Sequence, residues 1–259
     1  MSDTARVDVE YLLMSVLGCQ RTYLYSRPEA HLSEAQHTQF LAQLARREQG
    51  EPIAYIVGSQ AFWTLELNVA PCTLIPRSET ELLVELALDK AGSEARILDL
   101  GTGTGAVALS LAAELPQAHV EAVDVHSDAV TLAQANAAKH QLARAHIYQS
   151  DWFEQVQGRF DVIVSNPPYI EHADPHLERG DLRFEPSLAL VSGADGLDAI
   201  RAIVTHAPQY LMDDAWLMME HGWNQGEAVR QLLLNAGFKA VTTHCDYAGH
   251  ERVTMGLWP

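Results

Sequence analysis

The sequence is poor in cationic side chains and in cysteine. Of its 259 residues, 17 are Lys or Arg and 34 are Asp or Glu, so the formal charge is −17 at pH 7. Duplex nucleic acids are bound through basic surfaces that neutralise phosphates, and this composition disfavours such a partner. The three cysteines, Cys19, Cys72 and Cys245, form no CxxC pair and are odd in number. They indicate reduced thiols in place of a disulfide framework.

Long apolar runs are also missing. No segment approaches the ~18 consecutive apolar residues that a membrane-spanning helix needs. The first four residues, Met-Ser-Asp-Thr, do not begin a basic segment followed by an apolar one, as a secretory signal would. We therefore expect a soluble, cytoplasmic protein with no membrane association. Because 47% of the residues are hydrophobic, a chain of this length buries a substantial core by itself.

The twelve histidines do not form a recognisable metal motif. His172 and His176 have i,i+4 spacing, but Pro175 lies between them and no HExxH pattern is present. Zinc sites on helices rely on that pattern or on similar His and Cys pairs. We expect solvated histidines and no metal.

Helical periodicity dominates the first sixty residues. Apolar residues recur at spacings of three and four over 9–17, and Gly18 follows as a stop. A second helix is predicted over 33–47, with Ser33 as its N-cap. The loose alternation of apolar residues over 61–69 predicts a short pair of strands.

From about residue 74 the pattern changes to alternating strands and helices. Strands are expected at 97–100, 120–123, 145–148, 160–164, 216–220, 239–243 and 252–257, and helices at 106–115, 128–140, 197–210 and 226–235. This alternation is typical of an α/β fold with a doubly wound parallel sheet. We therefore divide the chain into a helical domain (1–60), a β-hairpin linker (61–73) and an α/β domain (74–259).

A glycine turn follows the first predicted strand of the α/β domain. It consists of Gly101, Thr102, Gly103, Thr104 and Gly105, directly after Asp99-Leu100, and a helix begins after it. Glycine lets the backbone turn sharply and approach a ligand without a Cβ, and the next helix presents free N–H groups. The spacing is GxGxG and differs from the GxGxxG dinucleotide fingerprint.

An acidic residue, Asp124, ends the next predicted strand. A carboxylate there can accept hydrogen bonds from both hydroxyls of a ribose. The glycine turn and Asp124 together predict a site for a ribose-containing ligand, whose identity the glycines leave open.

Asp151 and Trp152 follow the third predicted strand. The carboxyl edge of a doubly wound sheet is where ligands bind, so the indole of Trp152 is expected either to wall an adenine ring or to serve as a core aromatic. The carboxylate of Asp151 is placed to accept from the exocyclic amine of such a ring.

The segment Asn166, Pro167, Pro168 and Tyr169 follows the strand predicted at 160–164. Neither proline has an N–H, so the carbonyl oxygens and the Asn166 side-chain oxygen form acceptors with few competing donors. Such acceptors suit a planar NH₂ group, and Tyr169 offers a flat face for it. Acceptors that pull on both protons raise the electron density at an otherwise poor nucleophile and orient its attack. No ionisable base lies in the segment, so the final proton acceptor stays open.

These motifs resemble those of a known class of enzymes. Asp99 to Gly105, Asp124 and Asn166 to Tyr169 together resemble the S-adenosylmethionine-dependent amino-methyltransferases with a Rossmann-like fold. Within that class, three further segments look like the protein-(glutamine-N5) methyltransferases of peptide chain release factors: Leu74 to Glu81, Arg183 to Pro186 and Glu220 to Trp223. The likeness spans nearly the whole chain; its one departure is an N-terminus shorter than is usual in that family.

The resemblance implies a fold and an activity. The fold is a seven-stranded methyltransferase sheet whose last strand is antiparallel, joined to a small N-terminal helical domain by a β-hairpin. The activity is transfer of a methyl group from S-adenosylmethionine to the glutamine of the release factors' Gly-Gly-Gln loop, which modulates translation termination and leaves S-adenosylhomocysteine. The expected protein is a monomer that binds the release factor partly through its N-terminal helices, without direct contact to nucleic acid.

The resemblance also implies roles for residues. Gly101, Thr102, Gly103, Thr104, Gly105, Asp124, Trp152 and Asn166 would contact the methyl donor, and Asn166, Pro167, Pro168 and Tyr169 would hold the glutamine amide as the catalytic loop. Pro76 and Arg77 would lie over the donor pocket. Arg183 to Pro186 is either a substrate-binding loop or a salt-bridged surface loop. Ser78 and Glu81 fit a capping box that opens a helix reaching Leu88.

Two other functions remain open at this point. The acceptor loop also suits the exocyclic amine of adenine or guanine in DNA or RNA, with a flipped base on Tyr169, although the net charge of −17 opposes it. A non-catalytic module that only senses a nucleoside ligand is the third reading, which the intact acceptor loop disfavours.

Overall fold

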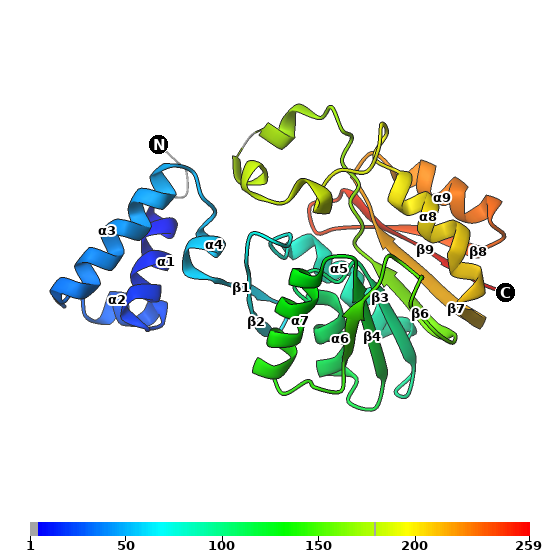
Figure 1. The fold of residues 1–259 in the computed structure, drawn as a ribbon, viewed down its shortest axis with the longest axis horizontal. Helices are drawn as coiled ribbons and strands as arrows, with labels where there is room; N and C mark the ends of the chain where they lie inside the picture. The colour runs from blue at the N-terminus through cyan, green and yellow to red at the C-terminus, as the bar shows by residue number, and fades with distance from the viewer. Residues whose placement is uncertain (1–4, 179) are drawn as a thin grey trace.

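Seven strands form the central sheet of the protein, seen in a computed structural model that describes residues 5–178 and 180–259 (Figure 1). Their order across the sheet is β5-β4-β3-β6-β7-β9-β8. The strands are β3 (Arg96–Leu100), β4 (His119–Asp124), β5 (His146–Gln149), β6 (Phe160–Ser165), β7 (Leu211–Glu220), β8 (Lys239–Cys245) and β9 (Glu251–Leu257). Only β9 runs against its neighbours in this sheet, since it pairs antiparallel with both β7 and β8. The predicted α/β sheet with an antiparallel last strand is therefore confirmed.

Helices cover both faces of the sheet (Figure 1). On one face lie α5 (Glu81–Lys90), α6 (Ala106–Glu114) and α7 (Ser127–Lys139), and on the other α8 (Asp198–His206) and α9 (Gly226–Asn235). Alternation along β3 separates the two cores: Ile97 packs on the α5–α7 side, whereas Leu98 and Leu100 pack with α8 and α9. Strands buried on both faces read as continuous apolar runs, which is why these elements were predictable.

The N-terminal helices form a lobe beside the sheet domain, at the left of Figure 1. It contains α1 (Ala5–Leu17), α2 (Arg21–Ser26), α3 (Glu34–Glu48) and α4 (Ile53–Val57). Ser33 caps α3 as predicted: its hydroxyl accepts from the Gln36 N–H, and the Gln36 side chain accepts from the Ser33 N–H. The sequence did not indicate α2 and α4, because helices of five or six residues are too short for a periodic pattern.

A β-hairpin connects the lobe to the sheet. Its strands are β1 (Ser59–Phe62) and β2 (Leu65–Asn68), so it begins two residues before the expected start at 61. Asn136, fully buried on α7, joins this hairpin to the glycine turn. Its Oδ1 accepts from Asn68 N at 2.8 Å, and its Nδ2 donates to Asn68 O at 3.0 Å and to Thr104 O at 2.9 Å.

Two local predictions were wrong. Residues Ser78–Thr80 form a 3₁₀ turn and α5 begins only at Glu81, so the expected capping box is absent there. The Ser78 hydroxyl instead donates to Glu79, and the Glu81 carboxylate accepts from the Trp63 N–H at 2.8 Å. The carboxylate therefore anchors the hairpin turn to α5, a long-range partner that a local motif cannot reveal.

The strand predicted at 216–220 is longer at its N-terminal end. β7 starts at Leu211, directly after α8 and a 3₁₀ turn that contains Pro208. The exposed acids Asp213 and Asp214 interrupt its apolar pattern, and the register with β6 shifts between Phe160 and Val162. A bulged strand with exposed acids loses the period-two signal.

We expect Asn136→Ala to destabilise the protein by about 2–4 kcal/mol, because it leaves buried backbone groups of Asn68 and Thr104 unpaired. Thermal unfolding should show this as a fall in Tm of roughly 5–15 °C for a chain of this size. Asn235→Ala, at the exposed end of α9, is the control and should shift Tm by no more than ~2 °C. Equal shifts for both variants would contradict this role of Asn136.

Candidate active site

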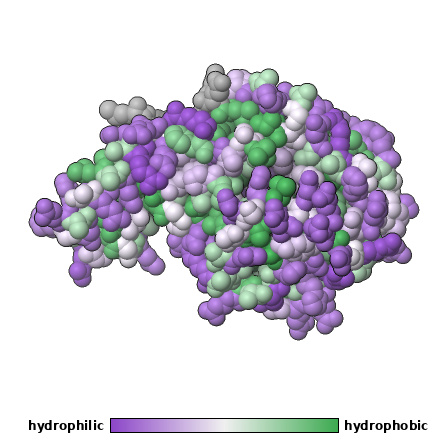
Figure 2. Space-filling model, viewed as in Figure 1, coloured by the Kyte–Doolittle hydropathy of each residue, from purple (hydrophilic) through white to green (hydrophobic). Residues whose placement is uncertain are grey.

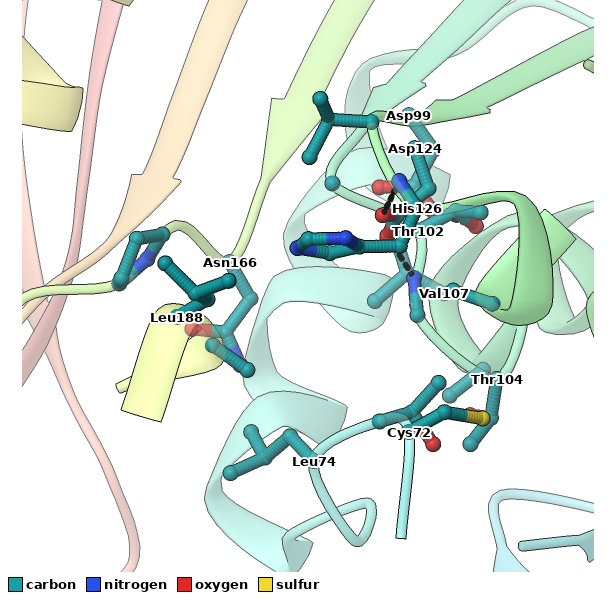
Figure 3. A pocket seen from close by; sticks show the side chains of 18 of the residues that line it. Cys72, Leu74, Asp99, Thr102, Thr104, Val107, Asp124, His126, Asn166 and Leu188 are labelled. Atoms are coloured by element: carbon teal, nitrogen blue, oxygen red, sulfur yellow. Dashed lines mark hydrogen bonds between the residues drawn. The ribbon is translucent and has the colours of Figure 1, made fainter. Parts of the chain in front are cut away.

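A cavity opens at the carboxyl ends of β3, β4 and β6. Asn166 and Leu188 lie on one side of it, and Thr102, Thr104 and Asp124 lie on the opposite side (Figure 3). This edge of a doubly wound sheet is where ligands bind. In Figure 2, hydrophilic residues cover most of the visible face, and hydrophobic residues gather near its middle, over the region of the loop between β6 and α8.

The glycine turn is held against β4 by its own backbone. The N–H groups of Gly101 and Thr102 both donate to the carbonyl of Val123 at 2.9 Å. Gly101 has φ +72°, and a Cβ there would lie 3.6 Å from the Trp152 ring. Gly105 has φ +85°, and a Cβ there would lie 2.9 Å from Leu109 Cδ1. Gly101 therefore borders the cavity, whereas Gly105 is required for the turn and the packing of α6.

Asp99 fixes the other end of the turn. It is 2% exposed, and its Oδ2 accepts from the Thr102 hydroxyl at 2.7 Å and from Ala108 N at 3.2 Å. Burial raises the pKa of Asp99 to about 6, although both hydrogen bonds favour the charged form. The carboxyl group thus ties β3 to the turn and to the first turn of α6.

Asp124 stands at the end of β4 with both oxygens oriented by backbone groups. Oδ2 accepts from Gly103 N and Oδ1 from His126 N, each at 2.9 Å. The side chain is 8% exposed and lines the cavity. Because each carboxylate oxygen can accept more than one hydrogen bond, Asp124 retains capacity for two ligand hydroxyls.

Trp152 lies between the cavity and the core. It lines the cavity, and it also packs against the apolar cluster on the α8–α9 side of the sheet. Its φ of +43° is unusual for a non-glycine residue. The Ser150 hydroxyl donates to the Trp152 carbonyl at 2.9 Å and helps to hold this bend. Asp151 lines the cavity beside it.

Asn166 follows β6 and faces the cavity with an unsatisfied acceptor. Its Nδ2 donates to the Thr80 hydroxyl oxygen at 3.2 Å. Its Oδ1 is buried, and no group in the described part of the chain donates to it. A buried acceptor without a donor costs roughly 1–3 kcal/mol. An N–H or O–H of a ligand that reaches this oxygen would satisfy it.

The other residues of the Asn-Pro-Pro-Tyr loop differ in position. Pro168 lines the cavity, whereas Pro167 is buried behind it and Tyr169 does not line it. The Tyr169 hydroxyl donates to Glu220 Oε1 at 3.2 Å, and its carbonyl accepts from Gln225 Nε2 at 3.0 Å. Burial raises the pKa of the Tyr169 phenol. The phenol is thus a fixed structural donor in this conformation.

The cavity therefore unites most, but not all, of the residues singled out from the sequence. Gly101, Thr102, Gly103, Thr104, Asp124, Trp152, Asn166 and Pro168 line it, and Gly105, Pro167 and Tyr169 do not. The sequence alone indicates no cavity role for Cys72, Thr80 or Leu188, which also line it. Thr80 lies within the family-like segment Leu74 to Glu81, but its role becomes visible only when the fold brings it to the strand ends.

The loop around Arg183 to Pro186 contacts residues 75–77, which directly follow the linker. Glu185 has a buried carboxylate that forms an ion pair with Arg77 and accepts from Ile75 N at 3.2 Å. Burial raises the pKa of Glu185 in spite of the nearby Arg77 guanidinium. Pro76 and Arg77 line the cavity, and Arg183 donates to Gln49 O of the helical lobe at 2.9 Å.

His126 lines the cavity beside Asp124, whereas the histidines singled out for their spacing lie elsewhere. The His176 ring pairs with Asp174 at 2.7 Å. Within residues 5–178 and 180–259, no three His, Cys, Asp or Glu side chains lie together as a metal site would require. In the same ranges no helix is both long and apolar enough to cross a membrane.

Comparison with known proteins places these features in context. Residues 78–180 match the family model described as "Methyltransferase small domain", and residues 1–58 match "PrmC N-terminal domain". The release factor glutamine methyltransferases of Vibrio cholerae and Pseudomonas aeruginosa are 50% and 51% identical to this chain, over 99% of its length and 91% and 94% of theirs. A methyltransferase structure from Pyrococcus furiosus shares the fold, with a TM-score of 0.58 at 18% identity over 83% of this chain and 98% of that one.

The strand order, the glycine turn at the end of β3 and the acceptor loop after β6 define a methyltransferase of the Rossmann-like class. Sequence identity of about 50% to the release factor glutamine methyltransferases, over almost the full chain, identifies the family within this class. The chain belongs to the release factor glutamine methyltransferase family.

The raised pKa of Asp99 predicts a pH-dependent stability. Because the folded protein holds this proton more tightly than the unfolded chain, the contribution favours folding at low pH and is lost as the pH rises through about 6. Asp99→Asn removes this pH-dependent contribution to the free energy of unfolding. We expect the loss of unfolding free energy between pH 5 and pH 7.5 to be about 1–2 kcal/mol smaller in Asp99→Asn than in the wild type.

Urea unfolding at the two pH values measures this difference. Asp213→Asn, on the exposed part of β7, is the control and should keep the wild-type slope. An unchanged slope in Asp99→Asn would show that the buried carboxyl group titrates normally.

Proposed function

We propose that this protein transfers a methyl group from S-adenosylmethionine to the side-chain amide nitrogen of the glutamine in the Gly-Gly-Gln loop of peptide chain release factors, and thereby modulates translation termination. Membership of the family supports the reaction class. The single structural observation that carries the proposal is the buried, unsatisfied Oδ1 of Asn166, for which the described residues provide no donor. A carboxamide NH₂ group is a donor of the right kind for it.

The wall opposite Asn166 is suited to hold the methyl donor. Gly101 to Thr104 leave room for close approach of a ligand to the backbone, and Asp124 offers both oxygens to ribose hydroxyls. Trp152 provides an indole surface for the adenine, and Asp151 a carboxylate for its amine. When bound, the donor supplies an electrophilic methyl group on a sulfonium, and S-adenosylhomocysteine is the product.

The acceptor loop addresses the weak nucleophilicity of a carboxamide. Its nitrogen lone pair is delocalised, and a hydrogen bond from its N–H to Asn166 Oδ1 increases the electron density at nitrogen. Pro167 and Pro168 have no N–H groups that compete for the neighbouring carbonyl oxygens. Tyr169, anchored at both its hydroxyl and its carbonyl, stiffens the loop. Holding the nitrogen in one direction can lower the barrier by several kcal/mol.

The helical lobe extends the protein beyond the cavity. We assign residues 1–60 to a domain that binds the release factor, 61–73 to the hairpin linker and 74–259 to the methyltransferase domain. The support is the separate lobe of α1–α3 and its contact with the loop after β6 through Arg183. The acidic charge of −17 favours a protein substrate over nucleic acid. We further propose that the enzyme works as a monomer in the cytoplasm, where release factors act, and needs no metal.

The direct test is incubation of a folded release factor with the enzyme and S-adenosylmethionine, followed by peptide mass spectrometry. We expect a 14 Da increase on the loop glutamine, since one methyl replaces one hydrogen, and none on a factor in which that glutamine is replaced by asparagine. In Asn166→Ala the rate should fall by about 10²–10³-fold, as when one oriented polar group is removed from an active site. An unmodified glutamine after reaction with the wild-type enzyme would refute the proposal.

Binding of the methyl donor should depend on Asp124. We expect Asp124→Asn to raise the Kd for S-adenosylmethionine by about 10–100-fold, because hydrogen bonds to a charged acceptor contribute roughly 1.5–3 kcal/mol. Isothermal titration calorimetry measures the Kd without any protein substrate. Asp128→Asn, exposed in the first turn of α7, is the matched control. An equal Kd for Asp124→Asn and the wild type would exclude Asp124 from the ribose site.

A further inference from the structure

Asn166 can accept a hydrogen bond from the substrate amide in only one orientation of its side-chain amide. With Oδ1 toward the cavity it accepts from a substrate N–H, whereas a flipped amide would present Nδ2 and repel that N–H. In the structure the orientation is set by the hydrogen bond from Nδ2 to the Thr80 hydroxyl oxygen at 3.2 Å. Thr80 itself is 4% exposed. Its hydroxyl proton therefore has to find an acceptor inside the protein.

The buried acceptor group next to that hydroxyl is the carboxylate of Glu220. The residue ends β7, is 1% exposed, and lies beside Thr80 and the Tyr169 hydroxyl, both of which favour its charged form. Oε1 accepts from Tyr169 at 3.2 Å. Oε2 is buried, and the hydrogen-bond geometry of the described chain leaves it free. In its ionised form Glu220 only accepts hydrogen bonds. A Thr80 proton drawn to this carboxylate points away from Asn166 and leaves the Thr80 oxygen to receive Nδ2.

No cation neutralises Glu220 through a direct ion pair among the described residues. Arg252 on β9 stabilises its charge from a distance, but Arg252 itself pairs with Asp246 at 3.2 Å. Glu79, in the turn that carries Thr80, opposes the charge. His221, the next residue, directs its ring to Thr254 at 2.7 Å. A nearly isolated buried carboxylate is costly, and nothing in the sheet requires one at this strand end.

We propose that Glu220 is a positioning residue for methyl transfer: through Thr80 it sets the orientation of the Asn166 amide, and through the Tyr169 hydroxyl it anchors the acceptor loop. Glu220 does not line the cavity, so it acts without touching the substrate. The inference rests on the proposed function for its consequence in catalysis, but the orientation of Asn166 can be measured without any substrate.

The kinetic test uses Glu220→Gln, which keeps the shape and introduces an NH₂ donor. This NH₂ group can donate to the Thr80 oxygen, which turns the Thr80 hydroxyl proton toward Asn166. We expect kcat to fall by about 10–100-fold, as for a misplaced reacting group, while the Kd for S-adenosylmethionine stays within about twofold of wild type. Glu251→Gln, the same change on β9 where the carboxylate pairs with Arg230, should keep the wild-type kcat.

Thr80 provides a second variant in case Glu220→Gln folds poorly. Thr80→Val removes the hydroxyl and should lower kcat by a similar factor. Thr80→Ser keeps the hydroxyl and should recover at least about tenfold of that loss. A kcat within about twofold of wild type for folded Glu220→Gln, or no difference between Thr80→Val and Thr80→Ser, would overturn the proposal.

The substrate-free test follows the Asn166 side-chain amide by NMR, with its signals assigned by their loss in Asn166→Asp. Burial raises the pKa of Glu220 to about 7, so the amide signals should shift with a midpoint near pH 7 in the wild type and not in Glu220→Gln. A midpoint that persists in Glu220→Gln, or signals that do not shift in the wild type, would overturn the proposal. If the wild-type enzyme methylates no release factor but this titration is seen, the proposed function fails while the positioning role stands.

Discussion

The site depends on a single side-chain orientation. The Asn166 amide donates to Thr80 through Nδ2. Its Oδ1 is buried, and no described group of the protein donates to it. The neighbouring strands hold this amide in place. The Ser165 hydroxyl, one residue earlier, donates to the Leu100 carbonyl on β3 at 2.8 Å. This bond holds β6 against the strand that precedes the glycine turn. The Asn166 amide and the wall that carries the glycine turn are therefore fixed to adjacent strands of one sheet, and their separation is set by backbone pairing.

Much of this arrangement was predictable because its signals are local. Buried strands of the sheet read as apolar runs, the glycine turn and Asp124 occur at strand ends, and the Asn-Pro-Pro-Tyr segment lacks donors by composition. The order in which parallel strands end at one edge then brings these motifs together. The likeness to a family added the substrate and the antiparallel β9, which periodicity alone could not supply.

What could not be predicted depends on partners distant in the sequence. Thr80 faces Asn166 across 86 positions, and Glu81 was taken for a capping residue because its true donor, Trp63 N, lies on the hairpin. Tyr169 was expected to offer a face to the ligand, whereas in the structure its hydroxyl is bound to Glu220 and it is not among the residues that line the cavity. In each case a polar side chain has several chemically equivalent partners, and only the packed structure selects one.

The linker has a mechanical role in addition to joining two lobes. Its carbonyl at Thr73 accepts from the buried Tyr55 hydroxyl of α4 at 2.6 Å. Two residues beyond the linker, the Ile75 N–H donates to Glu185 of the loop after β6. The same stretch of linker borders the cavity. The helical lobe, the cavity rim and the loop after β6 are therefore tied together through one short stretch of backbone, so the position of the rim is fixed jointly by both lobes.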